Sequence, residues 1–285
     1  MSQRTNVDNK LPKQGSMKSQ IKKATKAQIG TDLGKLPQTF VLPPSSELPS
    51  WTKLKRAKIH WLQLKNSFKD FWSLILFLKW EPKRHPLTRK HTRKPLELDN
   101  RIGIAKDLHL QFHKSLGAGD MKALQTICCE GLLKTSRTRI EQRKALRRTT
   151  EYWQLLSYTG VNYPTWLNRW PLSGFLPNAA TKVVADRLAP LPFADTYIRQ
   201  CTVRIRSVQD YMLANMDKST ILKHTDYVVL QKMSSKGEEG PWKLWGITEP
   251  TTIEEMDAML SGKSQDAGTT LSDRIRDKIS SLSPV

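Results

Sequence analysis

Two different spacings of apolar residues divide the chain near residue 150. From 101 to about 148 apolar residues recur every three to four positions, which predicts helices. Gly117-Ala118-Gly119 is expected to end the first helix, and Asp120 is a suitable N-cap for the next. The expected buried faces consist of Ala105, Leu108, Phe112, Leu116, Leu124, Ile127, Cys128, Leu132, Leu133 and Ile140.

After residue 150 the spacing approaches two, which predicts strands. In one of them Cys201, Val203 and Ile205 point to one face, and Arg204 and Arg206 point to the other. The predicted fold is α+β, with helices segregated to one face of a curved, mostly antiparallel sheet. The expected strands are 151–158, 181–189, 196–209, 226–233 and 242–247, the last two joined by a Ser- and Gly-rich turn. The predicted sheet core contains Cys201, Val203, Ile205, Val229 and Leu230.

The end of the chain is mildly acidic and predicts two short helices. Thr252-Ile253-Glu254-Glu255 has the pattern of a capping box, and Leu271, Ile275, Ile279 and Leu282 follow a helical spacing. The chain therefore divides into a basic, largely extended arm (1–50), an amphipathic helix with a polycationic linker (51–98), an α+β domain (99–250) and a helical tail (251–285).

Residues 51–80 are rich in tryptophan and are flanked by lysine and arginine. We expect a helix with one broad apolar stripe and with Lys65, Lys69 and Asp70 on the opposite side. Such a helix fits a lipid headgroup layer, and it fits a protein or RNA surface equally well. Its apolar run 71–78 is far too short to span a bilayer. The predicted membrane or partner contacts are Phe68, Phe71, Trp72, Phe77 and Trp80.

The charge of the chain indicates a polyanionic partner. Its 47 Lys and Arg against 26 Asp and Glu give a net charge of +21, and the sequence pI is about 10.0. Residues 1–100 hold 21 of these cations and only 7 of the acids. Residues 1–35 are basic and poor in acids, which is typical of either a disordered tail or a mitochondrial transit peptide.

The segment 82–95 has six Lys and Arg, no acid and a proline at each end. A polycation of this kind neutralises phosphates without reading sequence. The predicted phosphate-binding residues are Lys53, Lys55, Arg56, Lys58, Lys83, Arg84, Arg89, Lys90, Arg93 and Lys94.

Metal and catalytic chemistry have little support in the sequence. The three cysteines exclude a disulfide scaffold and a four-cysteine zinc site. His109 and His113 have the spacing of a metal pair but lack the glutamate of a zincin, so we expect them to border the core or solvent. The acid/base candidates for a pocket are His224, Asp226 and Asp195, each expected near a strand end or loop. We predict no enzyme activity, no metal and no cofactor.

Four elements together resemble a known domain. They are Gly119-Asp120 followed by Leu124, the segment 185–188 (Ala-Asp-Arg-Leu), the strand 199–207 and the closing hairpin 227–246. This pattern resembles the Tim-forty-four-like domain, shared by the motor-anchoring subunit of the presequence translocase and by the mitochondrial large-subunit ribosomal protein L-forty-five with its relative, the Mba-type ribosome receptor. The motif Leu-Pro-x-Thr-Phe-Val-x-Pro at 36–43, before a Trp-rich helix, resembles the ribosomal branch.

The resemblance implies a cystatin-like (nuclear-transport-factor-two-like) cone in the mitochondrial large ribosomal subunit, near the exit tunnel. The basic residues above would then bind rRNA. Neighbouring ribosomal proteins, inner-membrane lipid and an Oxa-type insertase would be the other partners, with the protein peripheral to the matrix face of the inner membrane. Two alternatives stay open: a protein-translocation adaptor that binds no RNA, and a small-ligand enzyme that uses the cone pocket.

Overall fold

The computed structural model describes residues 34–36, 39–43, 53–76, 78, 96–145, 151–169, 175–191, 196–212, 219–235 and 238–260. Residues Thr31–Val285 belong to one compact unit. Several predictions lie outside the described residues: the transit segment, the tail helix at 271–282, Asp195, Phe77, Trp80, and Lys83, Arg84, Arg89, Lys90, Arg93 and Lys94.

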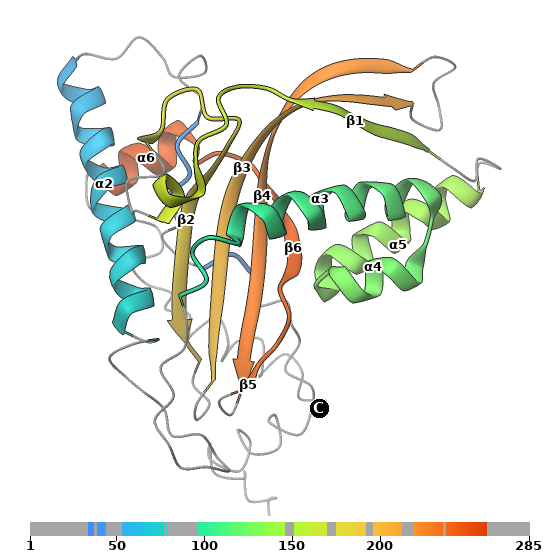
Figure 1. The fold of residues 1–285 in the computed structure, drawn as a ribbon, viewed down its shortest axis with the longest axis horizontal. Helices are drawn as coiled ribbons and strands as arrows, with labels where there is room; N and C mark the ends of the chain where they lie inside the picture. Colours follow the sequence, from blue (N-terminus) through green and yellow to red (C-terminus); the bar gives the residue numbers. More distant parts are fainter. Residues whose placement is uncertain are drawn as a thin grey trace, which may run out of the picture. The chain divides into compact units, whose positions relative to one another are not determined.

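A strongly curled antiparallel sheet forms the centre of this unit (Figure 1). The long strands β3 (Tyr197–Met212) and β4 (Thr220–Ser235) pair along almost their whole length. The other edge of β3 pairs first with β2 (Thr181–Pro190) and then with β1 (Tyr152–Tyr158). The short strands β5 (Glu238–Glu239) and β6 (Lys243–Thr248) pair with β4. All five predicted strand regions are confirmed.

Three helices cover the inner face of the sheet: α3 (Arg101–Ala118), α4 (Met121–Ile127) and α5 (Glu130–Ala145). Gly119 ends α3 in the left-handed region at φ 75°, which glycine adopts without strain, and the Asp120 carboxylate accepts two backbone N–H groups at the start of α4. Both predictions of helix ends are confirmed. The helices bury their apolar residues against Val183, Cys201, Val203, Ile205, Val228, Leu230 and Leu244.

The outer face is covered by a segment of the N-terminal arm and by α6 (Ile253–Leu260). The Leu36 N–H donates to the Gln200 side chain, and the Tyr227 hydroxyl donates to the Leu42 carbonyl. Gln200 and Tyr227 project from the side opposite to the core residues of β3 and β4, because neighbouring residues of a strand alternate between faces. Phe40 then packs against Met256 of α6. The helices that pack directly on the sheet, α3, α4 and α5, share one face, whereas α6 docks on the arm and on α2.

The helix α2 (Lys53–Ile75) lies along the edge strand β2 (Figure 1). Its first half meets the arm and α6 through Ile59, and its last turns pack Leu74 and Leu78 on Leu188 and Tyr197. A short 3₁₀ helix, η2 (Thr165–Arg169), lies in the connection between β1 and β2. None of the helices within the described ranges is long and apolar enough to cross a membrane.

Candidate interaction surface

The outward side of α2 is both apolar and basic. Leu54, Trp61, Phe68 and Trp72 are 77%, 67%, 52% and 52% exposed, although they are among the largest side chains of the helix. Their spacing of seven, seven and four residues places all four on one side of an α-helix. We call these four residues, together with the exposed Lys58, Lys65 and Lys69, the outer face of α2.

The three lysines of this face lie between the aromatic residues and not opposite them. Lys65 lies four residues after Trp61, and Lys69 lies next to Phe68, whereas Asp70 is buried against the sheet. The prediction that Lys65, Lys69 and Asp70 lie together opposite the apolar stripe is therefore wrong for the two lysines. The helix does not dock through the broad apolar stripe that the sequence predicts. It docks through a narrower buried side, which carries Ile59, Gln63, Asp70 and Leu74.

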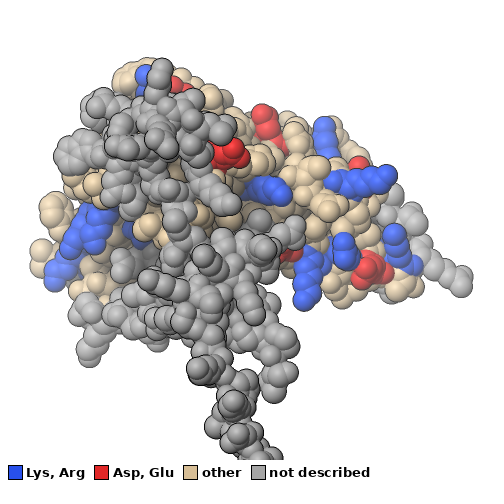
Figure 2. Space-filling view, turned by 90° about the horizontal axis from the view of Figure 1, so that it is seen from below, with Lys and Arg blue, Asp and Glu red and all other residues tan. Residues whose placement is uncertain are grey.

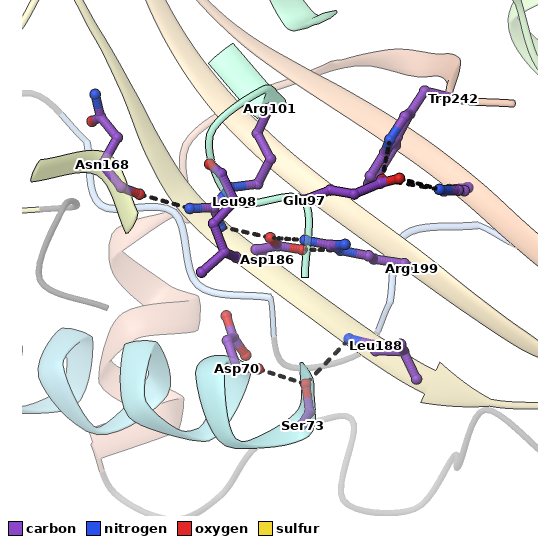
Figure 3. A network of polar contacts seen from close by, with 11 residues as sticks. Asp70, Ser73, Glu97, Leu98, Arg101, Asn168, Asp186, Leu188, Arg199 and Trp242 are labelled. Atoms are coloured by element: carbon purple, nitrogen blue, oxygen red, sulfur yellow. Dashed lines mark hydrogen bonds and ion pairs between the residues drawn. The ribbon is translucent and has the colours of Figure 1, made fainter. Parts of the chain in front are cut away.

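Polar contacts add to the apolar packing that holds the C-terminal half of α2 on β2 (Figure 3). The Arg187 side chain contacts the Asp70 carboxylate at 2.7 Å, and the Ser73 hydroxyl accepts the Leu188 N–H at 3.2 Å. Burial raises the pKa of Asp70 to about 6, against the opposing attraction of Arg187. The helix is thus seated by a buried ion pair, which leaves its aromatic residues outside.

A second buried ion cluster lies next to this contact. The carboxylate of Asp186 on β2 accepts Arg101 Nη1 at 2.6 Å and two hydrogen bonds from Arg199 at 2.9 and 2.7 Å (Figure 3). Arg101 also donates to the carbonyls of Leu98 and Asn168. Burial alone would raise the pKa of Asp186, but the two guanidinium groups outweigh it and hold this pKa below its usual range. The cluster fixes the start of α3 to β2, β3 and η2.

The residues just before α3 are held in the same region. Lys232 of β4 contacts the Glu97 carboxylate at 2.9 Å and the Glu239 carboxylate at 2.5 Å, and the Trp242 indole N–H donates to Glu97 at 3.2 Å. Leu96 and Leu98 pack on the same apolar cluster as Leu78. Leu78 and Leu96 lie on either side of the polycationic segment 82–95. Both are therefore anchored in the same apolar cluster.

The predicted phosphate-binding residues of α2 have different surroundings. Lys53 begins the helix, and Lys55 contacts Asp257 of α6 at 3.0 Å. Arg56 and Lys58 are exposed. Figure 2 shows Lys and Arg side chains at the margin where α2 lies and again over α3, α4 and α5. Of the predicted phosphate contacts in α2, only Lys58 belongs to its outer face.

The predicted membrane or partner contacts separate into two groups. Phe68 and Trp72 are exposed on the outer face of α2, whereas Phe71 is half-buried. Phe71 lines a hollow of about 30 Å³, together with Ser67, Asp70, Arg101 and Asp186. Sequence reasoning did not include Leu54 and Trp61, the two most exposed apolar residues of the helix, because they precede the continuous apolar run at 71–78.

The buried His109 of α3 pairs with the partly buried Asp226 of β4. His109 is 0% exposed, and its Nε2 lies 3.3 Å from Oδ2 of Asp226. Gln209 donates to the same carboxylate at 2.8 Å and accepts the Trp153 indole N–H at 2.9 Å. Burial opposes ionisation of Asp226, but contact with His109 and Gln209 lowers its pKa below the usual value.

The second histidine of the α3 pair joins the same network. His113 stacks on Trp153 with ring centroids 4.6 Å apart, and burial lowers its pKa to about 3. In the described part of the chain, no group of His, Cys, Asp and Glu could hold a metal ion. The expectation that Asp226 and His224 lie near a strand end is wrong, because β4 extends from Thr220 to Ser235. The predicted strand began only at Asp226, because the residues before it lack the alternation.

Comparison with known proteins gave no match to a family model and none to a curated protein sequence.

Proposed function

We propose that this chain is a structural constituent of the mitochondrial large ribosomal subunit near the peptide exit tunnel. In this role it binds rRNA and tethers the ribosome to the matrix face of the inner membrane, beside an Oxa-type insertase, for co-translational insertion. Neighbouring large-subunit proteins contact it as well. The observation that carries this proposal is the outer face of α2, where aromatic and basic side chains alternate and are exposed.

The curled sheet with helices on its inner face is compatible with the cone expected from the resemblance. We therefore propose that residues 99–250 form a cystatin-like, Tim-forty-four-like domain. The described contacts support a scaffolding role for this domain, because it holds α2 along one edge and fixes the start of α3 with buried ions. Its surface then presents the basic and aromatic groups to larger partners.

Membrane attachment follows from the chemistry of the outer face of α2. Tryptophan and phenylalanine at headgroup depth, with lysines between them, are the arrangement of peripheral helices on anionic bilayers. Each lysine near such a surface contributes on the order of 1 kcal/mol, so Lys58, Lys65 and Lys69 support peripheral binding but not insertion. We expect carbonate or high-salt washing to release the protein from membranes.

RNA binding is assigned to the basic residues of 53–58 and 82–95. Six phosphate contacts would weaken association by roughly three orders of magnitude between low and moderate salt. The test replaces Lys83, Arg84, Arg89, Lys90, Arg93 and Lys94 by Ala, and sediments the full chain with large subunits over a range of salt in the presence of magnesium. The variant should bind more weakly and with a smaller salt slope.

The matched control removes the same number of charges elsewhere. The control residues all belong to the helices of the inner face: Lys114, Lys122, Lys134, Arg137, Arg139 and Lys144, each replaced by Ala. This control should keep the wild-type salt slope. Unchanged association and slope in the 82–95 variant would refute RNA binding by that segment. Membrane binding without sedimentation would favour the translocation adaptor.

The His109–Asp226 pair is the observation that favours an enzyme as the second candidate. A carboxylate that orients a histidine is a common arrangement in general acid–base catalysis. However, His109 is completely buried, and its Nε2 faces Asp226 and not a cavity. The network therefore offers no exposed nitrogen to a substrate, and a structural role for His109 agrees better with its complete burial.

A further inference from the structure

Three basic side chains lie together on the outer face of the sheet. Lys182 of β2 is directly opposite Arg204 of β3, and Arg206 follows two residues along the same strand. Because alternate residues of a strand share a face, the three side chains project to one side, opposite to Val203 and Ile205 of the core. We call Lys182, Arg204 and Arg206 the β2–β3 cation cluster.

This arrangement is unfavourable by itself. Like charges directly opposite each other destabilise a sheet, and partial burial increases the cost. Burial, together with the neighbouring Arg204, lowers the pKa of Lys182 to about 8. Burial also lowers the pKa of Arg204; Tyr227, directly opposite on β4, acts against this effect, and the charge of Arg206 adds to it. The fold therefore places Lys182 and Arg204 in surroundings that disfavour their charged forms.

Within the described residues, the two arginines of the cluster have no carboxylate partner, unlike the buried Arg101 and Arg199. Arg199, which also lies on β3, shares the Asp186 carboxylate with Arg101. Among the described residues, Arg204 and Arg206 form no ion pair. Arg204 donates to the Ala179 carbonyl at 3.0 Å, but its Nε is buried without an acceptor. A buried donor without a partner is destabilising, and no acceptor for this one is found among the described residues.

We infer that Lys182, Arg204 and Arg206 form a binding site for a phosphate group. A phosphate carries several acceptor oxygens and matches the fork of a guanidinium group, so it supplies the negative charge and the acceptor that Arg204 and Arg206 lack among the described residues. RNA, phospholipid headgroups and free phosphate all offer this chemistry. The site lies on the sheet, apart from the outer face of α2, and it goes beyond the proposed function.

The test is thermal unfolding of the full chain at neutral pH in sodium phosphate and in sodium chloride of equal ionic strength. Wild type should show a saturable rise of Tm that is specific to phosphate. The Arg206→Gln variant should require at least a tenfold higher phosphate concentration for the same rise of Tm. In chloride its Tm should be equal or higher, because the substitution removes a like charge. Lys182→Gln is a second variant for which the same loss of response is expected.

The control Lys134→Gln removes an exposed charge from α5 and should keep the wild-type response. An equal phosphate response in wild type and both cluster variants would overturn the inference, and so would a wild-type Tm that does not distinguish phosphate from chloride. A Trp61→Ser, Phe68→Ser variant should retain the response, which separates this site from the proposed membrane contact.

Two further binding measurements identify the source of the phosphate group. One uses a short single-stranded RNA, and the other uses vesicles that contain phosphatidic acid. The source of the phosphate group is the ligand that meets three conditions. Arg206→Gln weakens its binding, Lys134→Gln leaves its binding unchanged, and free phosphate displaces it. If both ligands bind wild type and Arg206→Gln equally while the phosphate response differs, free phosphate is the source.

Discussion

The inner face of the sheet is held by apolar packing, whereas the contact between α2 and β2 combines apolar packing with buried ion pairs. On the inner face, α3, α4 and α5 bury apolar side chains such as Phe112 and Leu124 against Val203 and Ile205. In the contact of α2 with β2, a buried carboxylate, Asp70, faces Arg187, and Asp186 lies alongside with its two arginines. The most exposed aromatic residues of α2 point away from this contact.

This difference indicates what α2 is for. A helix that only stabilised the fold would bury its aromatic residues, because burying an aromatic side chain contributes roughly 1.5–3 kcal/mol. Here α2 buries Leu74 but none of its tryptophans, and the ion pair of Asp70 with Arg187 helps to define one orientation of the helix. The orientation leaves Trp61, Phe68 and Trp72 exposed, which agrees with an interaction surface.

The largest effect is expected from Asp186→Asn. Removing this charge leaves Arg101 and Arg199 buried without their counter-ion, and the free energy of unfolding should fall by about 3–5 kcal/mol in chemical denaturation. Asp99→Asn breaks an exposed pair with Arg169 and should have almost no effect. Equal stability of the two variants would show that the buried cluster does not anchor α3.

A comparable loss is expected from Ile205→Ala on the inner face. The side chain is fully buried, so the cavity should cost about 2–5 kcal/mol in the same denaturation experiment. Leu222→Ala, at an exposed position of β4, is the control and should change stability little. A loss below that of the control would mean that the inner face is not the main apolar core.

The sequence predicts the inner face well because its signals are local and periodic. The Gly119 helix end, the Asp120 N-cap and the alternation around Val203 all agree with the structure, and so does the capping box of Thr252 and Glu255 in α6, outside the inner face. The buried state of Cys201, Val203, Ile205, Val229 and Leu230 is confirmed as well.

The contact between α2 and β2 was not predictable in the same way. Asp70 and Arg187 are 117 residues apart, and neither residue carries a local signal that it has a buried partner. The apolar residues of α2 are numerous enough to allow several buried faces, so periodicity alone did not select the correct one. The buried network of His109, Gln209 and Asp226 depends likewise on three separate elements.

A smaller, pH-dependent effect distinguishes Asp70 from the acids of the other networks. The pKa of Asp70 rises from about 3.8 to about 6 on folding. Between these pH values the native state therefore binds more protons than the unfolded state. As a result, Asp70 contributes more to the free energy of unfolding as the pH falls from 7 to 4. The difference in unfolding free energy between wild type and Asp70→Asn should therefore change by on the order of 1–3 kcal/mol across this window. A difference independent of pH would contradict the raised pKa.

The smallest effect on stability is expected from the outer face of α2. Replacing Trp61, Phe68 and Trp72 by Ser alters exposed positions, and the free energy of unfolding should change by less than about 0.5 kcal/mol per site. Thermal and chemical denaturation can check this. A loss as large as that of Ile205→Ala would mean that these side chains belong to the core of the protein.

Flotation with cardiolipin-containing liposomes tests the central claim most directly. The full chain should float with the vesicles at physiological salt and leave them at high salt, whereas the Trp61→Ser, Phe68→Ser, Trp72→Ser variant should stay in the soluble fraction. A Tyr152→Ser, Leu156→Ser, Ile221→Ser variant, changed at three exposed apolar positions of β1 and β4, should float like wild type. Equal flotation of the α2 variant and wild type would contradict the assignment of the outer face of α2 as the membrane contact.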